Sequence, residues 1–587
     1  MKIDRLQITN FRNFKHLDVR LGEHAVLVGE NRVGKSNLLY ALRLLLDPSL
    51  PDTGRQLREE DFWDGLARPL TENDRITIAV DLADFEKNDE QLANLAEHLI
   101  SSEPMVARLT YVFERVTGSE DVNDFDFSIY GGDRTENVVR SEIRRRLPLD
   151  LLPALRDAEG DLANWRRSPL RPLLDQAAAD LDAIELAKIG NEITAATEAI
   201  AALSPIKELA GAVTARLVSM VGIGQAGDFQ LGMLPTDPHR LIRALRPLID
   251  GGRRGIAEAS LGSANLLYLA LKSLEFELLV KEGRRDHTFL GIEEPEAHLH
   301  PHLQRLTFRH FLEERGASGQ TTILLTTHSP HIVSVAPLRT LVVLRRDADS
   351  ASTKAVSTAH LDLNEADVAD LQRYIDVTRG EIVFSRGVLL VEGDGEKFLV
   401  PILAKLNGFD LDELGITVCS VAGTNFLPYI KFLGQTGLQI PHAVLTDFDP
   451  KGDLSYGRER VIQLLEAIGE GVDPLETADE EIPELGAKHG FFLNTVTFEV
   501  DLFRSGRHKS MGKALQDLAK GQVSRDRAKQ WLADPKTLDE ERFLRDITVI
   551  GKGRFAQRLA TVIGKMTSKM CPAYILQAIE YVAARIR

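Results

Sequence analysis

The pattern of apolar and polar positions changes several times along this chain. In residues 1–137, short runs rich in β-branched and aromatic residues predict strands around one helix. In residues 138–225, apolar residues recur every three or four positions, which predicts a series of helices. Strand and helix patterns alternate again in residues 226–346 and 387–587, on either side of a polar segment at 347–386. The chain is therefore predicted to be an α/β protein with a helical insertion, a linker and a mostly helical C-terminal segment.

The individual elements follow from the same patterns. The first region has predicted strands at Ile3–Ile8, Leu17–Leu21, His24–Val28, Ile76–Leu82, Arg108–Phe113 and Phe125–Tyr130. Helical periodicity in the insertion covers Leu147–Leu155, Leu170–Leu186 and Ile193–Val218. The last region has predicted strands at Val388–Val391, Thr417–Val421 and His442–Leu445.

A glycine-rich loop follows the third predicted strand. Gly29-Glu30-Asn31-Arg32-Val33-Gly34-Lys35-Ser36 fits the pattern G-x-x-x-x-G-K-[ST], and Asn37–Leu46 continues as an apolar-faced helix. Such a loop turns backbone N–H groups and a helix N-terminus towards phosphate. Lys35 would neutralise the β- and γ-phosphates of ATP, and Ser36 would hold Mg²⁺. The predicted ATP-binding residues in this loop are Gly29, Asn31, Gly34, Lys35 and Ser36.

Two adjacent carboxylates end a later apolar run. Thr288–Ile292 leads into Glu293 and Glu294, and buried acids at such a position are costly unless a cation or water needs them. Glu293 is predicted to bind the Mg²⁺ shell, and Glu294 to position the attacking water. His328, directly after the β-rich run Thr321–Thr327, is predicted to reach the γ-phosphate.

Acidic residues also end the strands of the last region. Glu392 follows the strand at Val388–Val391, Glu396 comes four residues later, and Asp447 and Asp449 follow the strand at His442–Leu445. The carboxyl ends of parallel strands share one edge of a sheet, so these four carboxylates are predicted to converge. Oxygen ligands of this kind select Mg²⁺ or Mn²⁺.

Composition and charge narrow the class of protein. The net charge is −16, yet residues 502–587 hold 18 Lys or Arg and 8 Asp or Glu, a local balance of +10. A segregated basic segment beside a metal-binding sheet is what a DNA backbone requires, although a solvated basic face has the same composition. Cys419 and Cys571 lie far apart, which argues against disulfides or a cysteine zinc site. No apolar run is long enough for a bilayer, so we expect a cytoplasmic protein without membrane contact.

The first half of the chain resembles the ABC-type ATPase heads of SMC proteins. The resemblance rests on Ile8-Thr9-Asn10-Phe11-Arg12-Asn13-Phe14 before the glycine-rich loop, and on Ser260-Leu261-Gly262 before a predicted helix at Leu266–Val280. In such heads a Ser-x-Gly signature caps the γ-phosphate bound by a partner subunit. The resemblance implies that Ser260 and Gly262 bind ATP across a dimer, and that the loop Glu296–His300 faces the partner's site.

The second half resembles a Toprim domain, through Glu392-Gly-x-x-Glu396 and Asp447-x-Asp449. The order of head, helical insertion and Toprim domain resembles the overcoming lysogenization defect (OLD) nucleases, to which the Gabija nuclease subunit is related. Thr497–Asp501 is similar to the late acidic strand of that family, so Glu499 and Asp501 are implied metal ligands on one strand face. Lys552, in Ile550–Ala556, is similar to the family lysine that stabilises transition-state charge. The resemblance also implies a homodimer formed through the helical insertion, and allows a helicase partner.

These observations predict an ATP-binding DNA endonuclease that uses two metal ions and acts in phage defence or DNA repair. The alternative is an SMC-like repair or recombination ATPase whose Toprim-like half binds DNA without cutting it. A topoisomerase would need a tyrosine nucleophile, and Tyr429, Tyr456, Tyr574 and Tyr581 show no recognisable motif. The sequence also lacks a recognisable polymerising context for a primase.

Overall fold

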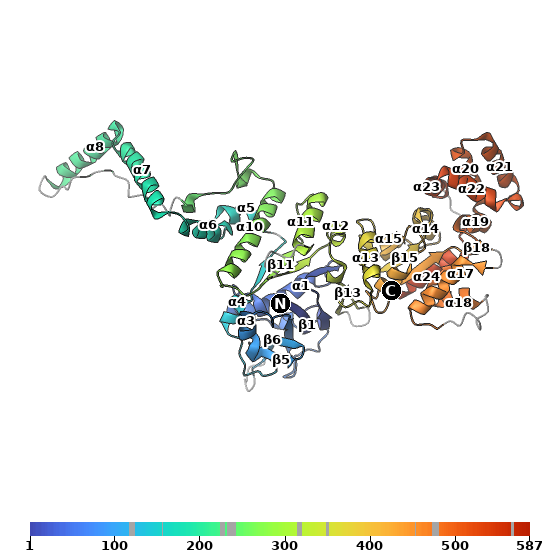
Figure 1. Cartoon of the computed structure of the whole chain (residues 1–587), viewed down its shortest axis with the longest axis horizontal. Helices are drawn as coiled ribbons and strands as arrows, with labels where there is room; N and C mark the ends of the chain where they lie inside the picture. The colour runs from blue at the N-terminus through green and yellow to red at the C-terminus, as the bar shows by residue number, and fades with distance from the viewer. Residues whose placement is uncertain are drawn as a thin grey trace. The chain divides into compact units, whose positions relative to one another are not determined.

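The computed structural model describes residues 1–116, 124–154, 156–222, 229, 231, 242–313, 320–347, 352–451, 454–471, 481–564 and 569–586 (Figure 1). The chain forms two compact units, which are considered separately below. The larger unit holds residues 1–154 and nearly all of the chain from residue 286 onward, and the smaller unit holds residues 155–285. The predicted α/β class is confirmed.

The larger unit begins with an antiparallel sheet whose strands are paired in the order β2-β1-β4-β6-β5, with β7 also on β6. These strands are β1 (Lys2–Phe11), β2 (Phe14–Arg20), β4 (Ile76–Ala83), β5 (Leu99–Ser102), β6 (Met105–Arg115) and β7 (Phe125–Gly131). Their alternating apolar residues, such as Leu6, Ile8 and Val80, are buried in one core with helix α1 (Lys35–Leu46).

A second sheet carries the nucleotide loop. Its order is β14-β13-β3-β12-β11-β8, and every neighbouring pair is parallel except β13 with β14. The strands are β3 (Ala25–Gly29), β8 (Leu149–Leu152), β11 (Thr288–Glu293), β12 (Thr321–Thr326), β13 (Leu341–Arg346) and β14 (Thr353–Ser357). Parallel pairing brings the ends of β3, β11 and β12 to one edge, which places the loop beside Glu293 and His328.

Two of these strands correct the sequence interpretation. Residues 149–152, predicted as helix, form β8 and pair with β11, because a short apolar run fits either structure until a neighbouring strand selects one. The head therefore extends past the predicted boundary at residue 138. Strand β14 lies in the predicted linker but pairs with β13, so that part of the linker belongs to the head sheet.

The smaller unit is mainly helical. It contains α5 (Ala158–Ala163), α6 (Leu170–Ala179), α7 (Ala183–Ala201), α8 (Ser204–Val221), α10 (Leu261–Lys281) and the short hairpin β9 (Leu248–Ile249) and β10 (Arg254–Gly255). Helix α10 packs against α5 and α6, although the sequence assigned it to the resumed head. Two of the predicted helical stretches, Leu170–Leu186 and Ile193–Val218, are present, each divided by a turn, whereas Leu147–Leu155 contains strand β8 instead. Residues 223–228, 230 and 232–241, which fall in the predicted insertion and head, lie outside the described residues.

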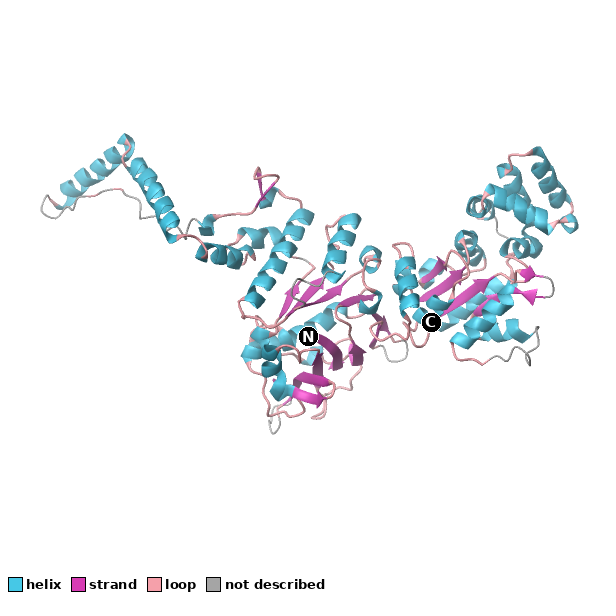
Figure 2. Ribbon diagram, viewed as in Figure 1, coloured by secondary structure: helices cyan, strands magenta, loops and turns pink. Residues whose placement is uncertain are grey.

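The Toprim-like region has a four-stranded parallel sheet of order β16-β15-β17-β20 (Figure 2). The strands are β15 (Gly387–Val391), β16 (Ile416–Ser420), β17 (His442–Thr446) and β20 (Phe491–Leu493). The first three were predicted, and β20 was not. Helices α14 (Asp394–Leu406), α16 (Leu427–Leu433), α17 (Tyr456–Ala467) and α18 (Glu481–Lys488) connect or follow these strands, and α24 (Ala573–Arg585) returns to pack on β15, β17 and β20.

A helical subdomain separates β20 from α24. It contains α19 (Phe498–Leu502), α20 (His508–Leu518), α21 (Gln522–Ala533), α22 (Glu540–Ile550) and α23 (Lys552–Ile563). Trp531, Phe543 and Phe555 are buried in a core shared with the sheet. Among the described helices, none is long and apolar enough to cross a membrane.

Candidate functional site

The nucleotide loop has a backbone that only certain residues allow. Gly34 has φ +99°, in the left-handed region, and a Cβ on Gly29 would clash with the Leu344 carbonyl oxygen. Helix α1 begins at the next residue, Lys35, so its free N–H groups open onto the loop. Asn31 and Ser36 are exposed at the same loop. This geometry can bind a phosphate group.

Lys35 is folded onto its own loop. Its Nζ donates to the carbonyl oxygens of Gly29 at 2.8 Å and Glu30 at 3.0 Å. Burial lowers the pKa of Lys35 to about 8, against the attraction of Glu294 and Glu296. A bound phosphate would offer Lys35 Nζ charged oxygen acceptors in place of these two neutral carbonyl oxygens, and hydrogen bonds to charged acceptors are stronger.

Glu293 is the last residue of β11, and Glu294 follows in a strained conformation. Glu294 has φ +40°, and its N–H donates to the Thr326 carbonyl oxygen at 3.0 Å. A non-glycine residue held in this region costs about 1–3 kcal/mol, and such strain is concentrated at functional sites. The carboxylate of Glu294 lies 3.8 Å from His328 Nε2. Burial, followed by repulsion from Lys35, lowers the pKa of His328, so the imidazole favours its neutral form.

Glu296 contacts the histidine loop of its own subunit. Its Oε1 accepts a hydrogen bond of 2.6 Å from the N–H of His328, and its Oε2 is buried without a partner. Burial raises the pKa of Glu296. The carboxylate therefore holds the backbone of the histidine loop from within the same subunit. The position of Glu296 directly after Glu293-Glu294-Pro295 does not predict this contact, because the contact depends on the pairing of β12 with β11.

Arg12 was not singled out from the sequence but braces the start of α1. Its guanidinium donates to Asp61 Oδ1 at 2.8 Å and to Asn37 Oδ1 at 2.9 Å, and lies 4.6 Å from the ring centroid of Tyr40. Its position in the Asn10–Phe14 segment before the nucleotide loop was the sequence signal that could have identified it.

In the smaller unit, Ser260 is the N-cap of α10 and accepts from the N–H of Ser263 at 3.2 Å, with Gly262 in the first turn.

The second site begins at the end of β15. Glu392 Oε1 accepts from Thr446 Oγ1 at 2.6 Å and from the Asp447 N–H at 2.8 Å. Arg460, on α17, places Nη2 3.2 Å from Glu392 Oε1 and 2.9 Å from Asp449 Oδ2. Asp449 has φ +48°, a second strained acid. Arg460 therefore supplies the cation that Glu392 and Asp449 share in this structure.

Asp447 and Glu396 are two further buried acids of this group. Asp447 Oδ1 accepts from Asn494 Nδ2 at 2.5 Å and from the Phe498 N–H at 2.8 Å. Burial and then repulsion from Glu392 raise the pKa of Asp447 to about 8. Burial and then repulsion from Asp447 raise the pKa of Glu396, in the first turn of α14, to about 8. Asn494, which the sequence analysis missed, positions Asp447, and only the unpredicted strand β20 brings it there.

Glu499 pairs with Lys552. The Glu499 side chain is 7 % exposed, its Oε1 lies 3.1 Å from Lys552 Nζ, and its Oε2 is buried without a hydrogen-bond partner. Burial lowers the pKa of Lys552, but attraction and hydrogen bonding to Glu499 more than offset it, so the pKa is raised and the amine stays charged.

The predicted strand at Thr497–Asp501 is wrong, since residues 498–502 form helix α19 with Thr497 as N-cap. Residues two apart on a helix point about 200° apart, so Glu499 and Asp501 do not share a face. Asp501 instead accepts hydrogen bonds from the N–H and the hydroxyl of Thr495, the first at 2.7 Å. The β-branched residues around Glu499 are typical of a strand, which explains the wrong prediction. Thr497 is a residue type favoured at a helix N-cap and therefore indicated a helix.

The acids do not form a complete metal site in this conformation. Within the described ranges, no three carboxylate, imidazole or thiol groups lie close enough together to surround one ion as they stand. The predicted convergence is instead seen as the Glu392–Arg460–Asp449 cluster and as repulsion among Glu396, Asp447 and Glu499. The donor chemistry fits a hard divalent cation, because all donors are oxygens, most are buried, and Glu499 Oε2 lacks a partner. Small side-chain rotations would have to complete the coordination.

Comparison with known proteins agrees with this arrangement. The family described as AAA ATPase domain matches residues 1–129 and 149–333, and the family described as overcoming lysogenization defect protein-like, TOPRIM domain matches residues 383–449. The chain is 24% identical over 487 residues to endonuclease GajA of Bacillus cereus, covering 79% of this chain and 78% of the relative. It is 24% identical over 466 residues to the OLD nuclease of Thermus scotoductus, covering 76% and 82%.

A solved structure of the C-terminal region of the Burkholderia pseudomallei OLD protein is 44% identical over 35% of this chain and 100% of that chain, with a TM-score of 0.32. A Toprim domain implies divalent-metal binding. The ATPase match includes the nucleotide loop and Glu293, and the TOPRIM match includes Glu392 and Asp447. This protein belongs to the OLD family, with an AAA/ABC-type ATPase head followed by an OLD-like Toprim domain.

Proposed function

We propose that this protein is an ATP-binding, divalent-metal-dependent DNA endonuclease. The observation that carries the proposal is the buried Glu499 carboxylate, with one oxygen on Lys552 and the other without a partner, beside Asp447 and Glu396. A domain that only bound DNA would gain nothing from burying acids that repel each other. The names of the relatives, endonuclease GajA and OLD nuclease, support the same reaction.

In this proposal Glu392, Glu396, Asp447, Asp449 and Glu499 hold two cations, Mg²⁺ or Mn²⁺. When bound, the cations activate water and stabilise the leaving 3′-oxygen. Lys552 donates to the scissile phosphate as negative charge develops on it. Asn494 keeps Asp447 oriented, and Asp501 orders the loop before α19.

The substrate is proposed to lie along the helical subdomain. Residues 502–587 carry the excess positive charge, and Lys552 begins one of the helices in that segment. Basic side chains spread over neighbouring helices suit a phosphate backbone more than a compact ligand. We propose phage defence or DNA repair as the biological setting, and a helicase partner is part of that proposal.

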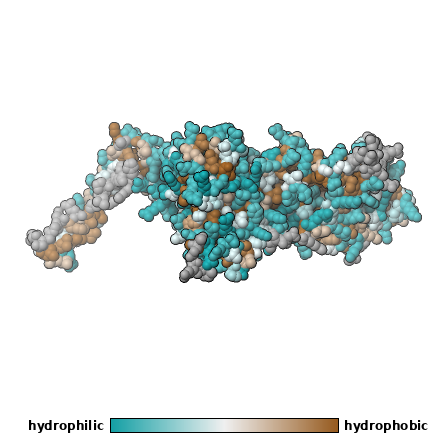
Figure 3. All heavy atoms as spheres, turned by 90° about the horizontal axis from the view of Figure 1, so that it is seen from below, coloured by the Kyte–Doolittle hydropathy of each residue, from teal (hydrophilic) through white to brown (hydrophobic). Residues whose placement is uncertain are grey.

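The head is proposed to bind and hydrolyse ATP. Lys35 and Ser36 would bind the phosphates and Mg²⁺, Glu293 would complete the Mg²⁺ shell, and Glu294 would orient the attacking water, with His328 near the γ-phosphate. Ser260 and Gly262 would act on the ATP of a second copy. The smaller unit suits dimerisation, since α7 and α8 expose large apolar side chains such as Ile184 and Met220. Figure 3 shows apolar residues gathered in this part of the molecule.

The decisive experiment is cleavage of supercoiled plasmid with Mg²⁺, Mn²⁺ or EDTA, with and without ATP. Wild-type protein is expected to nick or linearise the plasmid only with metal, and Glu392→Ala is expected to abolish the reaction. Lys405→Ala, at the far end of α14 in an exposed pair with Asp410, is the matched control. Intact plasmid under every metal condition, with DNA binding retained, would favour the non-cutting ATPase instead.

A further inference from the structure

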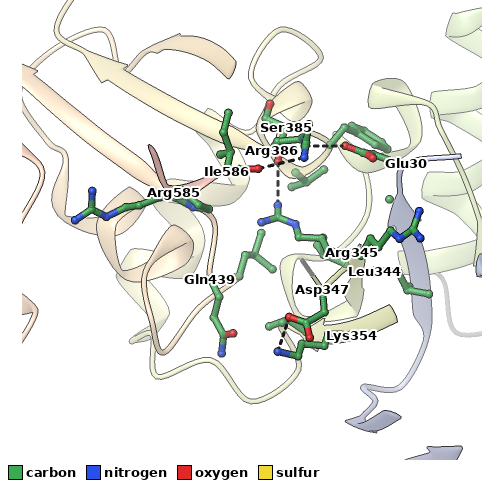
Figure 4. Close-up of a pocket in the computed structure, with 18 residues that line it drawn as sticks. Glu30, Leu344, Arg345, Asp347, Lys354, Ser385, Arg386, Gln439, Arg585 and Ile586 are labelled. Atoms are coloured by element: carbon green, nitrogen blue, oxygen red, sulfur yellow. Dashed lines mark hydrogen bonds and ion pairs between the residues drawn. The ribbon is translucent and has the colours of Figure 1, made fainter. Parts of the chain in front are cut away.

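A cavity of about 560 Å³ lies in the larger unit between the ends of β3 and β13 and the turn that precedes β15 (Figure 4). Gly29 and Glu30 form part of its wall, but Lys35, Ser36 and the Toprim acids do not. It therefore shares Gly29 and Glu30 with the nucleotide loop but lies apart from the phosphate-binding residues Lys35 and Ser36 and from the Toprim acids. Its volume is within the range of 300–1,000 Å³ or so that is typical of small-molecule sites.

The lining combines apolar surface with an excess of cations. Val343, Leu344, Val383, Leu438 and Ile586 supply apolar surface. The cationic residues are Arg345, Arg346, Lys354, Arg386 and Arg585, against the acids Glu30 and Asp347. Lys354 Nζ is 2.8 Å from Asp347, and Arg386 Nε is 3.6 Å from Glu30, so both acids are already engaged.

These pairs leave Arg345, Arg346 and Arg585 without an acid, and the least exposed of these three is Arg345. Its guanidinium extends towards Ser385 and donates to the carbonyl oxygen of that residue at 3.1 Å (Figure 4). Within the described part of the chain, no carboxylate lies at ion-pair distance from it. Burial lowers the pKa of Arg345 to about 10 despite the attraction of Glu30. Arg345 is only partly exposed, and an anion in the cavity would give its guanidinium a charged acceptor in addition to this carbonyl oxygen.

We propose that this cavity binds a small phosphorylated organic molecule of nucleotide size, with Arg345 as the anchor for its phosphate. A planar guanidinium binds phosphate through two parallel hydrogen bonds, and the apolar wall suits a ring system on the same molecule. Inorganic phosphate alone would leave that wall uncovered.

The position of the cavity gives its occupant contact with both halves of the chain. Glu30 belongs to the nucleotide loop, and Arg386 directly precedes β15, the strand that Glu392 follows. A bound phosphate would compete with Glu30 for Arg386. Binding of a phosphorylated metabolite would thereby change the Arg386–Glu30 contact, which joins the nucleotide loop to the segment before the Toprim strand β15.

Calorimetric titration with AMP, ATP and inorganic phosphate tests the proposal on full-length Lys35→Ala protein, whose nucleotide loop lacks its cation. AMP or ATP is expected to bind this variant with one site per chain. Adding Arg345→Met is expected to weaken that binding about tenfold or more, since it removes a charged bidentate pair. Arg345→Lys should lie between the two, and Arg309→Met, at an exposed position on α11 (Pro301–Glu313), should change nothing.

Three outcomes would overturn the proposal. One is the absence of nucleotide binding to Lys35→Ala, and another is equal affinity with and without Arg345→Met when both proteins melt normally. The third is binding of inorganic phosphate without either nucleotide. The measurement needs neither DNA nor cleavage, so its result is independent of the proposed nuclease.

Discussion

Lys552 Nζ lies 3.1 Å from Oε1 of Glu499, while Oε2 of the same carboxylate is buried without a hydrogen-bond partner. The lysine is 55% exposed and the glutamate 7%. The lysine therefore faces solvent, and the glutamate lies among the other acids of the site. This pair joins the proposed metal-binding acids to the basic helical subdomain.

Replacing Lys552 with Met is expected to lower the cleavage rate by about 10²–10³-fold, because one donor to the developing charge is lost. DNA affinity should fall much less, since many other cations remain. Plasmid cleavage and a filter-binding assay measure the two quantities. Lys405→Met is the control, and a variant that cleaves at the wild-type rate would remove Lys552 from the reaction.

Glu396 gives a stability prediction with a definite sign. Its folded-state pKa of about 8 lies above its unfolded value, so the neutral carboxyl stabilises the fold at low pH and that contribution is lost as pH rises from about 4.5 through 8. Glu396→Gln keeps the neutral form. At pH 8 without metal, the variant should be more stable than wild type by about 1–3 kcal/mol.

Denaturant unfolding at pH 5 and pH 8 in EDTA measures this difference. At pH 5 the two proteins should be nearly equally stable. Adding Mn²⁺ at pH 8 should stabilise wild type more than Glu396→Gln, because the amide is a weaker ligand. A variant that is less stable at pH 8 than wild type would show that the carboxylate is held charged by other groups.

Arg460 is expected to compete with metal for Glu392 and Asp449. Arg460→Gln should increase Mn²⁺ affinity about tenfold, or about 1.4 kcal/mol, because a positive charge leaves two of the ligands. The same change should lower the melting temperature without metal, since the two acids then repel each other unopposed. Titration calorimetry and thermal melting test both, with Arg373→Gln as control. Weaker Mn²⁺ binding would mean that Arg460 holds the ligands in place.

Glu294→Gln should bind ATP normally but hydrolyse it about 10²–10³-fold more slowly, because the amide cannot act as a base. Glutamate and glutamine side chains have the same size, so the substitution should not change the packing or the backbone conformation at this position. Binding of a fluorescent ATP analogue and phosphate release measure the two steps. Glu313→Gln, at the exposed end of α11, is the control. Normal hydrolysis would transfer the role to another residue.

The dimer prediction concerns the apolar side chains of α7 and α8. Ile184, 79% exposed, and Met220, 71% exposed, are replaced together by Glu. If these helices form the interface, burying two charges should shift the protein to monomers in light scattering at micromolar concentration. Arg171→Glu, on α6, should leave the mass unchanged. A wild-type protein that is already monomeric, with or without ATP, would contradict the prediction.

Much of this protein is determined by local sequence. The nucleotide loop is read directly from Gly29 to Ser36, because its glycines, lysine and following helix act within a few residues. The strands before Glu293, Glu392 and Asp447 are equally clear, since a carboxylate at the end of a buried apolar strand is costly unless it binds a cation or water. From these features alone the class, the order of the two halves and most of the candidate acids follow.

Tertiary packing decided the rest, because those features depend on partners distant in sequence. Residues 149–152 form a strand because they pair with the edge of β11. Asp501 and Glu499 point in different directions because α19 is a helix and not the predicted strand. Arg460 meets Glu392 and Asp449, and Asn494 meets Asp447, through folding of α17 and β20 onto the sheet. Arg345 faces its cavity because β13 lies beside the turn before β15. Such contacts join residues tens of positions apart, and no periodicity in one chain encodes them.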